Sequence, residues 1–130
     1  MTATTITAIH GFPLNVPLLA PFTIASVRLD HVENVAVRIR LEDGTEGWGE
    51  IPSLRPVTTE DQVAALDAID YLRAALVGRD AAEWRLLAEE LQLWLADLSA
   101  TRAGVEMALL DAVTRHSGVP LYQFFGGASD

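Results

Sequence analysis

The sequence predicts an α+β domain in which a three-stranded antiparallel meander sheet is followed by a three-helix bundle packed on it. Two patterns support this fold class: residues up to 50 alternate between apolar and polar side chains, whereas residues 59–117 repeat apolar side chains at spacings of three and four. A chain of 130 residues, half of them hydrophobic, can form one core. We therefore expect one domain over residues 1–125, with the sheet in 1–50 and the helices in 59–117.

The first two strands differ in how clearly the sequence defines them. Residues 4–14 are rich in β-branched side chains, and strict alternation assigns Ile6 and Ile9 to opposite sides of a strand. Prolines at 13, 17 and 21 predict an edge strand or a loop, and residues 21–26 are expected to form an apolar loop. The segment Val32–Leu41 is a clear strand, because apolar side chains from Val35 onward alternate with polar ones.

A tight turn and a glycine-rich strand complete the sheet. Asp43-Gly44 is typical of a hairpin turn, which sends the chain back through residues 46–50. Gly47 and Gly49 flank Trp48, and glycines within a strand indicate a bulge or a close backbone approach.

Three amphipathic helices are expected after residue 58. The first has Thr58 or Thr59 as its N-cap, Glu60 and Asp61 in its first turn, and ends at Gly78. Its apolar stripe consists of Val63, Leu66, Ile69, Leu72 and Leu76.

The second helix is capped by Asp80, and Trp84 and Trp94 are predicted to lie in the core. The third helix is capped by Ser99 and runs to about His116, and Gly118 follows its last turn.

Composition excludes several classes of function. The net charge is −9, which disfavours nucleic acid and anionic membrane surfaces as partners. The chain has no Cys, and all nine basic residues are Arg, so Lys-based and thiolate chemistry have no residue to carry them. Neither a signal peptide nor a membrane span is recognisable, and we expect a cytoplasmic protein.

Few side chains are candidates for chemistry. Glu46 and Glu50 lie four apart on a strand and share a face, which would suit acid–base work; the alternative is that Glu46 is solvated and Glu50 accepts hydrogen bonds from the backbone or from Arg. The histidines, His10, His31 and His116, lie far apart on different elements, and no metal site is predicted from them.

Several short motifs recur in a characteristic order. They are Pro21-Phe22 with Ala25, Asp43-Gly44 with Gly47-Trp48-Gly49-Glu50 and Pro52, Ser99-Ala100-Thr101-Arg102-Ala103 with Glu106-Met107-Ala108-Leu109-Leu110-Asp111, and Gly118-Val119-Pro120-Leu121-Tyr122 with Phe125-Gly126-Gly127. In this order and spacing, the chain resembles the N-terminal capping domain of the enolase superfamily. The branch is the mandelate racemase and muconate-lactonizing enzyme type, which includes o-succinylbenzoate synthases and dipeptide epimerases, and the loop after Glu50 is most similar to the dipeptide-epimerase type.

The resemblance implies a two-part enzyme. A TIM barrel would carry Mg²⁺ on acidic ligands, and a Lys or His base would remove the proton α to a carboxylate. Two loops of the capping domain would close over the barrel and contact a small carboxylate substrate such as a dipeptide or a cyclic acid. The substrate-binding residues implied on this chain are Phe22, Thr23, Ile24, Ala25 and Ser26 in one loop and Ile51, Pro52, Ser53 and Leu54 in the other.

The barrel expected from the resemblance would start where this sequence stops. Residues 126–130 match the beginning of the linker, and the catalytic residues and metal ligands have no counterpart before it. We therefore expect the substrate-specificity lid of a Mg²⁺-dependent isomerase or lyase, inert by itself, with its own barrel as partner. The alternative is a stand-alone interaction module that forms homo-oligomers through the surface meant for the barrel.

Overall fold

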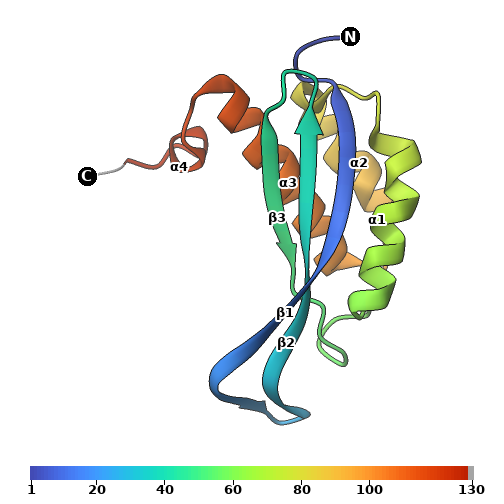
Figure 1. The fold of residues 1–130 in the computed structure, drawn as a ribbon, viewed down its shortest axis with the longest axis vertical. Helices are drawn as coiled ribbons and strands as arrows, with labels where there is room; N and C mark the ends of the chain where they lie inside the picture. Colours follow the sequence, from blue (N-terminus) through green and yellow to red (C-terminus); the bar gives the residue numbers. More distant parts are fainter. Residues whose placement is uncertain (129–130) are drawn as a thin grey trace.

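The structure, a computed structural model, describes residues 1–128 and has a sheet with its main helices on one face (Figure 1). The strands are β1 (Ile6–Ile24), β2 (Val27–Leu41) and β3 (Glu46–Ile51), in the order β1-β2-β3 and antiparallel throughout. The helices are α1 (Gln62–Leu76), the short 3-10 helix η1 (Ala81–Glu83), α2 (Trp84–Trp94), α3 (Ser99–Ser117) and α4 (Leu121–Phe124). The predicted α+β fold class and the meander are confirmed, and α4 is an addition to them.

The core lies between the sheet and the helices. The predicted alternation of β2 is confirmed, because Val35, Val37 and Ile39 are fully buried on the side that faces the helices. In β1 the strict alternation is wrong, because a register shift between Ile6 and Ala8 inserts one residue. As a result, Ile6 and Ile9 both point into the core, where each is 0% exposed.

The prediction of a loop at residues 21–26 is also wrong. β1 continues through the prolines, with Pro13 opposite Val35, and reaches Ile24 before a short turn leads into β2. An edge strand tolerates proline because the nitrogens on its outer side have no ladder partner. The far end of this hairpin extends beyond the helices in Figure 1. Strand β2 begins at Val27, five residues before the predicted Val32.

Strand β3 lies directly on helix α3, and its two glycines make this possible. A Cβ atom at Gly49 would stand 2.0 Å from the carbonyl oxygen of Gly104, and one at Gly47 would stand 2.2 Å from that of Ala108. The carboxylate of Asp111 on α3 accepts a hydrogen bond from the backbone N–H of Trp48 at 2.8 Å. The close backbone approach predicted for this strand is therefore confirmed.

The start of α1 differs from the prediction. Asp61 is the N-cap, and its carboxylate accepts from the backbone N–H of Ala64 at 2.9 Å. Thr58 and Thr59 precede the cap. The side chain of Glu60 accepts a hydrogen bond from the backbone N–H of Thr101 on α3 and does not belong to the first turn of α1. The stripe prediction fails at one residue, because Val63 in the first turn is 66% exposed.

The predicted burial of the tryptophans is only partly right. Trp94 packs against the edge of the core, whereas Trp84 is half-buried and its ring lies edge-to-face on that of Phe124, with 5.8 Å between centroids. The predicted span of the third helix agrees with α3, but its N-cap is Leu98, and Ser99 is the first helical residue rather than the cap. Gly118 closes the helix with a left-handed φ of 66°. Of the predicted linker start, residues 129 and 130 lie outside the described residues.

Within residues 1–128, none of the helices combines the length and the apolarity needed to cross a bilayer.

Candidate functional site

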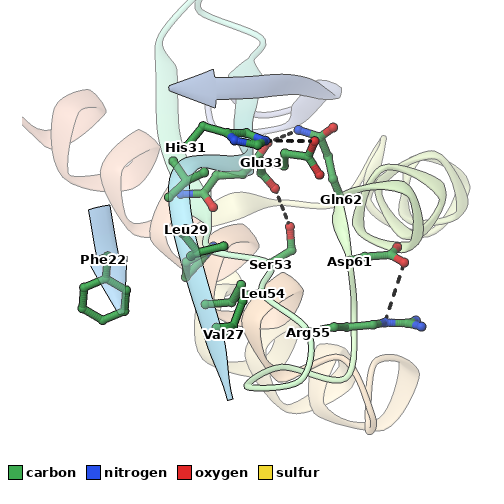
Figure 2. A pocket seen from close by; sticks show the side chains of 13 residues that line it. Phe22, Val27, Leu29, His31, Glu33, Ser53, Leu54, Arg55, Asp61 and Gln62 are labelled. Carbon is green, nitrogen blue, oxygen red and sulfur yellow. Dashed lines mark hydrogen bonds and ion pairs between the residues drawn. The ribbon is translucent and has the colours of Figure 1, made fainter. Parts of the chain in front are cut away.

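A hollow of about 550 Å³ opens between the extended β1–β2 hairpin and the loop that joins β3 to α1 (Figure 2). Its lining residues are Phe22, Val27, Leu29, His31, Val32, Glu33, Asn34, Pro52, Ser53, Leu54, Arg55, Asp61 and Gln62. Two segments that are some 30 residues apart in the sequence therefore face the same space.

The structure brings together four of the nine residues predicted to contact substrate. Phe22 from the hairpin and Pro52, Ser53 and Leu54 from the β3–α1 loop line the hollow. Residues 23–26 form the tip of the hairpin and are not among its lining residues. Ile51 belongs to the core, where it pairs with Val35 and is 0% exposed, so its role is to anchor the loop.

The middle of the hollow is apolar. Val27, Leu29 and Leu54 lie between Phe22 on one side and the Arg55–Asp61 pair on the other, as Figure 2 shows. Alternation in β2 directs Val27 and Leu29 to the same face of the strand. Neither residue is among the predicted ones, because the strand was expected to begin at residue 32; the apolar–polar alternation of residues 27–30 is the signal that identifies them.

Hydrogen bonds hold the loop against the strand. The hydroxyl of Ser53 donates to the backbone carbonyl oxygen of Glu33 at 2.9 Å, and Ser53 is almost fully buried. The side-chain amide of Gln62, at the start of α1, donates to the carbonyl oxygen of Asn34 at 2.7 Å. The two walls of the hollow are thus linked at its base.

The charged groups at the rim are paired with one another. Arg55 Nε lies 3.7 Å from a carboxylate oxygen of Asp61, whose pKa is held below its ordinary value first by the Ala64 backbone N–H and also by Arg55. Hydrogen bonds with Asp30 and then Glu33 raise the pKa of His31. The rim charges therefore largely compensate each other, and the interior offers apolar contact.

The carboxylates proposed for acid–base work lie elsewhere. Glu46 Oε1 is 3.6 Å from Arg38 Nη1, and Glu50 Oε1 accepts from the amide of Asn34 at 2.7 Å. Neither lines the hollow. Glu46 is therefore ion-paired rather than simply solvated, and the partner of Glu50 is a side-chain amide rather than the backbone or Arg donor expected for it.

The described residues of this chain do not form a magnesium site. Over the part of the chain that the structure describes, no three His, Asp or Glu side chains converge on a point that could hold a metal ion. The two acids of the hollow, Glu33 and Asp61, interact with His31 and Arg55, respectively. Any Mg²⁺ used with this domain would need ligands from other residues.

Relatives of this chain are longer enzymes. It is 52% identical over 120 residues to the L-Ala-D/L-amino acid epimerase of Populus trichocarpa, covering 91% of this chain and 28% of the relative. The structure of a mandelate racemase/muconate lactonizing protein from Herpetosiphon aurantiacus superposes with a TM-score of 0.94 at 43% identity, covering 99% of this chain and 36% of that one.

A dipeptide epimerase from Methylococcus capsulatus, solved in complex with Mg and the dipeptide L-Arg-D-Lys, superposes with a TM-score of 0.88 at 35% identity. The match covers 97% of this chain and 36% of that one. The chain thus spans about a third of the length of the proteins it resembles.

The family described as "Mandelate racemase / muconate lactonizing enzyme, N-terminal domain" matches residues 6–126, which is nearly the whole chain. The matched range contains all three strands and every helix from α1 to α4. The chain therefore belongs to the mandelate racemase / muconate lactonizing enzyme N-terminal domain family, the capping domains of the enolase superfamily.

Proposed function

We propose that this chain is the substrate-specificity lid of a Mg²⁺-dependent dipeptide epimerase, and that its hollow receives one side chain of the dipeptide. The observation that carries the proposal is the shared hollow: the hairpin end at Phe22 and the loop at Pro52–Leu54 form its two sides. These segments come from the two loops that the resemblance assigns to substrate contact.

The apolar middle of the hollow favours an apolar substrate side chain. Val27, Leu29 and Leu54 offer no hydrogen bond or charge, and Arg55 at the rim is already paired with Asp61. A cationic side chain packed against these three apolar residues would lose its hydration without gaining a hydrogen bond or a charge from them. We therefore place the substrate among dipeptides with an apolar residue, in contrast to the L-Arg-D-Lys bound to the Methylococcus relative.

The chemical step belongs to residues outside this chain. Removal of a proton α to a carboxylate needs a base and a cation that stabilises the resulting enediolate. The described acids that line the hollow are engaged at its rim, and the chain has no Lys. We assign this domain the selection of the substrate and expect it to be inert alone.

A domain exchange tests the proposal. This chain would replace the matching N-terminal residues of the Methylococcus epimerase, and turnover would be measured with Mg²⁺ as α-deuterium incorporation in D₂O by NMR. The substrates are an apolar dipeptide, L-Ala-L-Leu, and a cationic one, L-Arg-L-Lys. The chimera should change the ratio of kcat/KM in favour of the apolar dipeptide by about tenfold or more relative to the parent.

Two results would contradict the proposal. A ratio identical to that of the parent enzyme, in a chimera that is folded and active, would remove substrate selection from this domain. Turnover by the isolated chain would show that it is not inert. Circular dichroism and gel filtration of the chimera ensure that a loss of activity is not a loss of folding.

A second candidate function rests on the C-terminal end. Leu121, Tyr122, Phe124 and Phe125 are between 37% and 64% exposed, which is unusual for four neighbouring apolar side chains. A stand-alone module that self-associates through them would sediment as a dimer or larger species. Removal of residues 121–130 should then yield a monomer, and a chain that is monomeric both before and after removal would exclude this function.

A further inference from the structure

Glu60 carries a carboxylate that is fully buried although it lies in a loop. Its exposed fraction is 0%, and it directly precedes Asp61, the N-cap of α1. One carboxylate oxygen accepts a hydrogen bond from the backbone N–H of Thr101 at 2.7 Å, and the hydroxyl of Thr59 lies 2.9 Å from the other. Glu60 and Thr101 are 41 residues apart in the sequence.

The bond from Thr101 supplies a cap that α3 lacks. The first N–H groups of a helix have no partner within the helix, and its N-terminus carries partial positive charge. The N-cap residue of α3 is Leu98, whose side chain makes no capping bond. The carboxylate of Glu60, in the β3–α1 loop, caps α3 instead.

The same residue is connected to the wall of the hollow. The hydroxyl of Thr58 donates to the backbone carbonyl oxygen of Glu60 at 2.7 Å and accepts from the backbone N–H of Leu54 at 2.8 Å. The backbone N–H of Thr58 also donates to the carbonyl oxygen of Leu54 at 2.7 Å. Leu54 lines the hollow, so a continuous set of bonds runs from this wall through Thr58 and Glu60 to the start of α3.

A second contact strengthens this anchor. The Thr59 hydroxyl also meets the backbone carbonyl oxygen of Asp97, in the connection between α2 and α3. At its opposite end the loop is fixed to β2 by the bond from Ser53 to Glu33. The segment between Ser53 and Glu60 is thus held at both ends, and Glu60 is the anchor on the helical side.

We propose that Glu60 is a positioning residue of the hollow: its buried carboxylate fixes the loop of residues 52–59, and with it the side chain of Leu54, to the N-terminus of α3. The positioning stands on the bonds above. Its consequence for substrate rests on the proposed function, in which Leu54 contacts the substrate.

Hydrogen exchange of individual amides tests the positioning without any substrate. On the ¹⁵N-labelled chain, exchange would be followed by NMR at Leu54, Thr58 and Thr101, with Ile39 in β2 as the core reference. Glu60→Gln should accelerate exchange at the first three amides by about tenfold or more and leave Ile39 nearly unchanged. Glu89→Gln, the same change at an exposed site on α2, should alter none of them.

Three outcomes would overturn the proposal. Faster exchange at Thr101 alone would make Glu60 only a cap of α3. Equal acceleration at all four amides, including Ile39, would reduce its role to global stability. Unchanged exchange at Leu54 and Thr58 would show that the loop is held by other contacts.

A second variant separates the loop from the helix cap and does not depend on the folding of Glu60→Gln. Thr58→Val breaks the link between Leu54 and Glu60 but leaves the bond to Thr101. It should accelerate exchange at Leu54 and not at Thr101, and unchanged exchange at Leu54 would overturn the proposal.

The consequence for substrate has its own measurement. In the chimera, Glu60→Gln should raise KM for the apolar dipeptide several-fold, with a smaller change in kcat, because the wall is loosened and the chemical groups are not. Faster loop exchange with an unchanged KM would contradict this consequence. A chimera that is inactive with the unaltered chain would instead count against the proposed function, while the exchange result would stand.

Discussion

The contact between β3 and α3 makes Gly49→Ala the most informative single substitution for the fold. The added Cβ atom would stand 2.0 Å from the carbonyl oxygen of Gly104 and 3.0 Å from the backbone nitrogen of Ala108. Carbon–oxygen contacts are normally no shorter than about 3.3 Å, so the strand and the helix would have to separate by about 1.3 Å. Both opposing atoms belong to the backbone, so no side-chain rotation relieves the clash.

The cost can be estimated from this geometry. Overpacking typically costs about 1–3 kcal/mol, and a clash with rigid backbone belongs at the upper end. Separation of β3 from α3 would also strain the bond from Trp48 to Asp111. We expect Gly49→Ala to lower the free energy of unfolding by about 3 kcal/mol, equivalent to a fall in Tm of about 10 °C.

Urea unfolding of a matched pair provides the assay. Gly11→Ala is the same chemical change in β1, but its Cβ would meet side chains and no backbone: the end of Leu66 at 3.2 Å, which can move, and Ile69 at 3.4 Å, an ordinary contact distance. This control should change the free energy of unfolding by less than about 1 kcal/mol. If the two variants had equal stability, or if Gly49→Ala matched the unaltered chain, the reasoning about backbone contact would be refuted.

Two further predictions concern stability. Leu72 on α1 is 0% exposed, and Leu72→Ala should lower the free energy of unfolding in urea by about 3 kcal/mol. The control Leu93→Ala, at a side chain that is 79% exposed, should lower it by less than about 0.5 kcal/mol. Equal losses in the two variants would contradict the assignment of Leu72 to the core. The backbone N–H of Thr45 first, and then His116, lower the pKa of Asp43 to about 2 from its ordinary value of 3.8. Because this pKa is lower in the folded chain, the contribution of Asp43 is complete above about pH 4 and is lost as the pH falls toward 2. Asp43→Asn should therefore be less stable than the unaltered chain near neutral pH, with a difference that disappears near pH 2; a difference independent of pH would contradict the pairing.

Local patterns were sufficient to predict much of the fold. The alternation from Val35 to Leu41 has one physical cause, a strand with one face on a core, and the structure has that face. The glycines of β3 were predicted to allow a close approach, although the sequence did not identify the helix that approaches. Caps depend only on neighbouring residues: Gly118 closes α3 as predicted, and Asp80 caps the 3-10 helix η1 that leads into α2, although the N-cap of α2 itself is Glu83.

The errors arise where distant parts of the chain decide the local structure. β1 passes through three prolines because it lies at the edge of the sheet, a position that depends on the other strands. Glu60 was assigned to the first turn of α1, because its partner, the N–H of Thr101, is remote in sequence. No local pattern contains that information.

The candidate site could be predicted only in part for the same reason. The two segments were found as apolar stretches, but their shared hollow depends on the length and course of the β1–β2 hairpin. Val27 and Leu29 belong to the hollow because β2 begins at Val27, five residues before the predicted start at Val32.

The most direct test of substrate selection by this domain is the dipeptide preference of the chimera with and without Leu54→Asp. This substitution places a carboxylate on the apolar wall, where it would attract a cationic side chain. Leu54 is not part of the hydrophobic core, so the core contacts remain intact. We predict that the kcat/KM ratio moves by about tenfold or more toward L-Arg-L-Lys and away from L-Ala-L-Leu. An unchanged ratio in a folded, active variant would contradict the claim that this hollow selects the substrate.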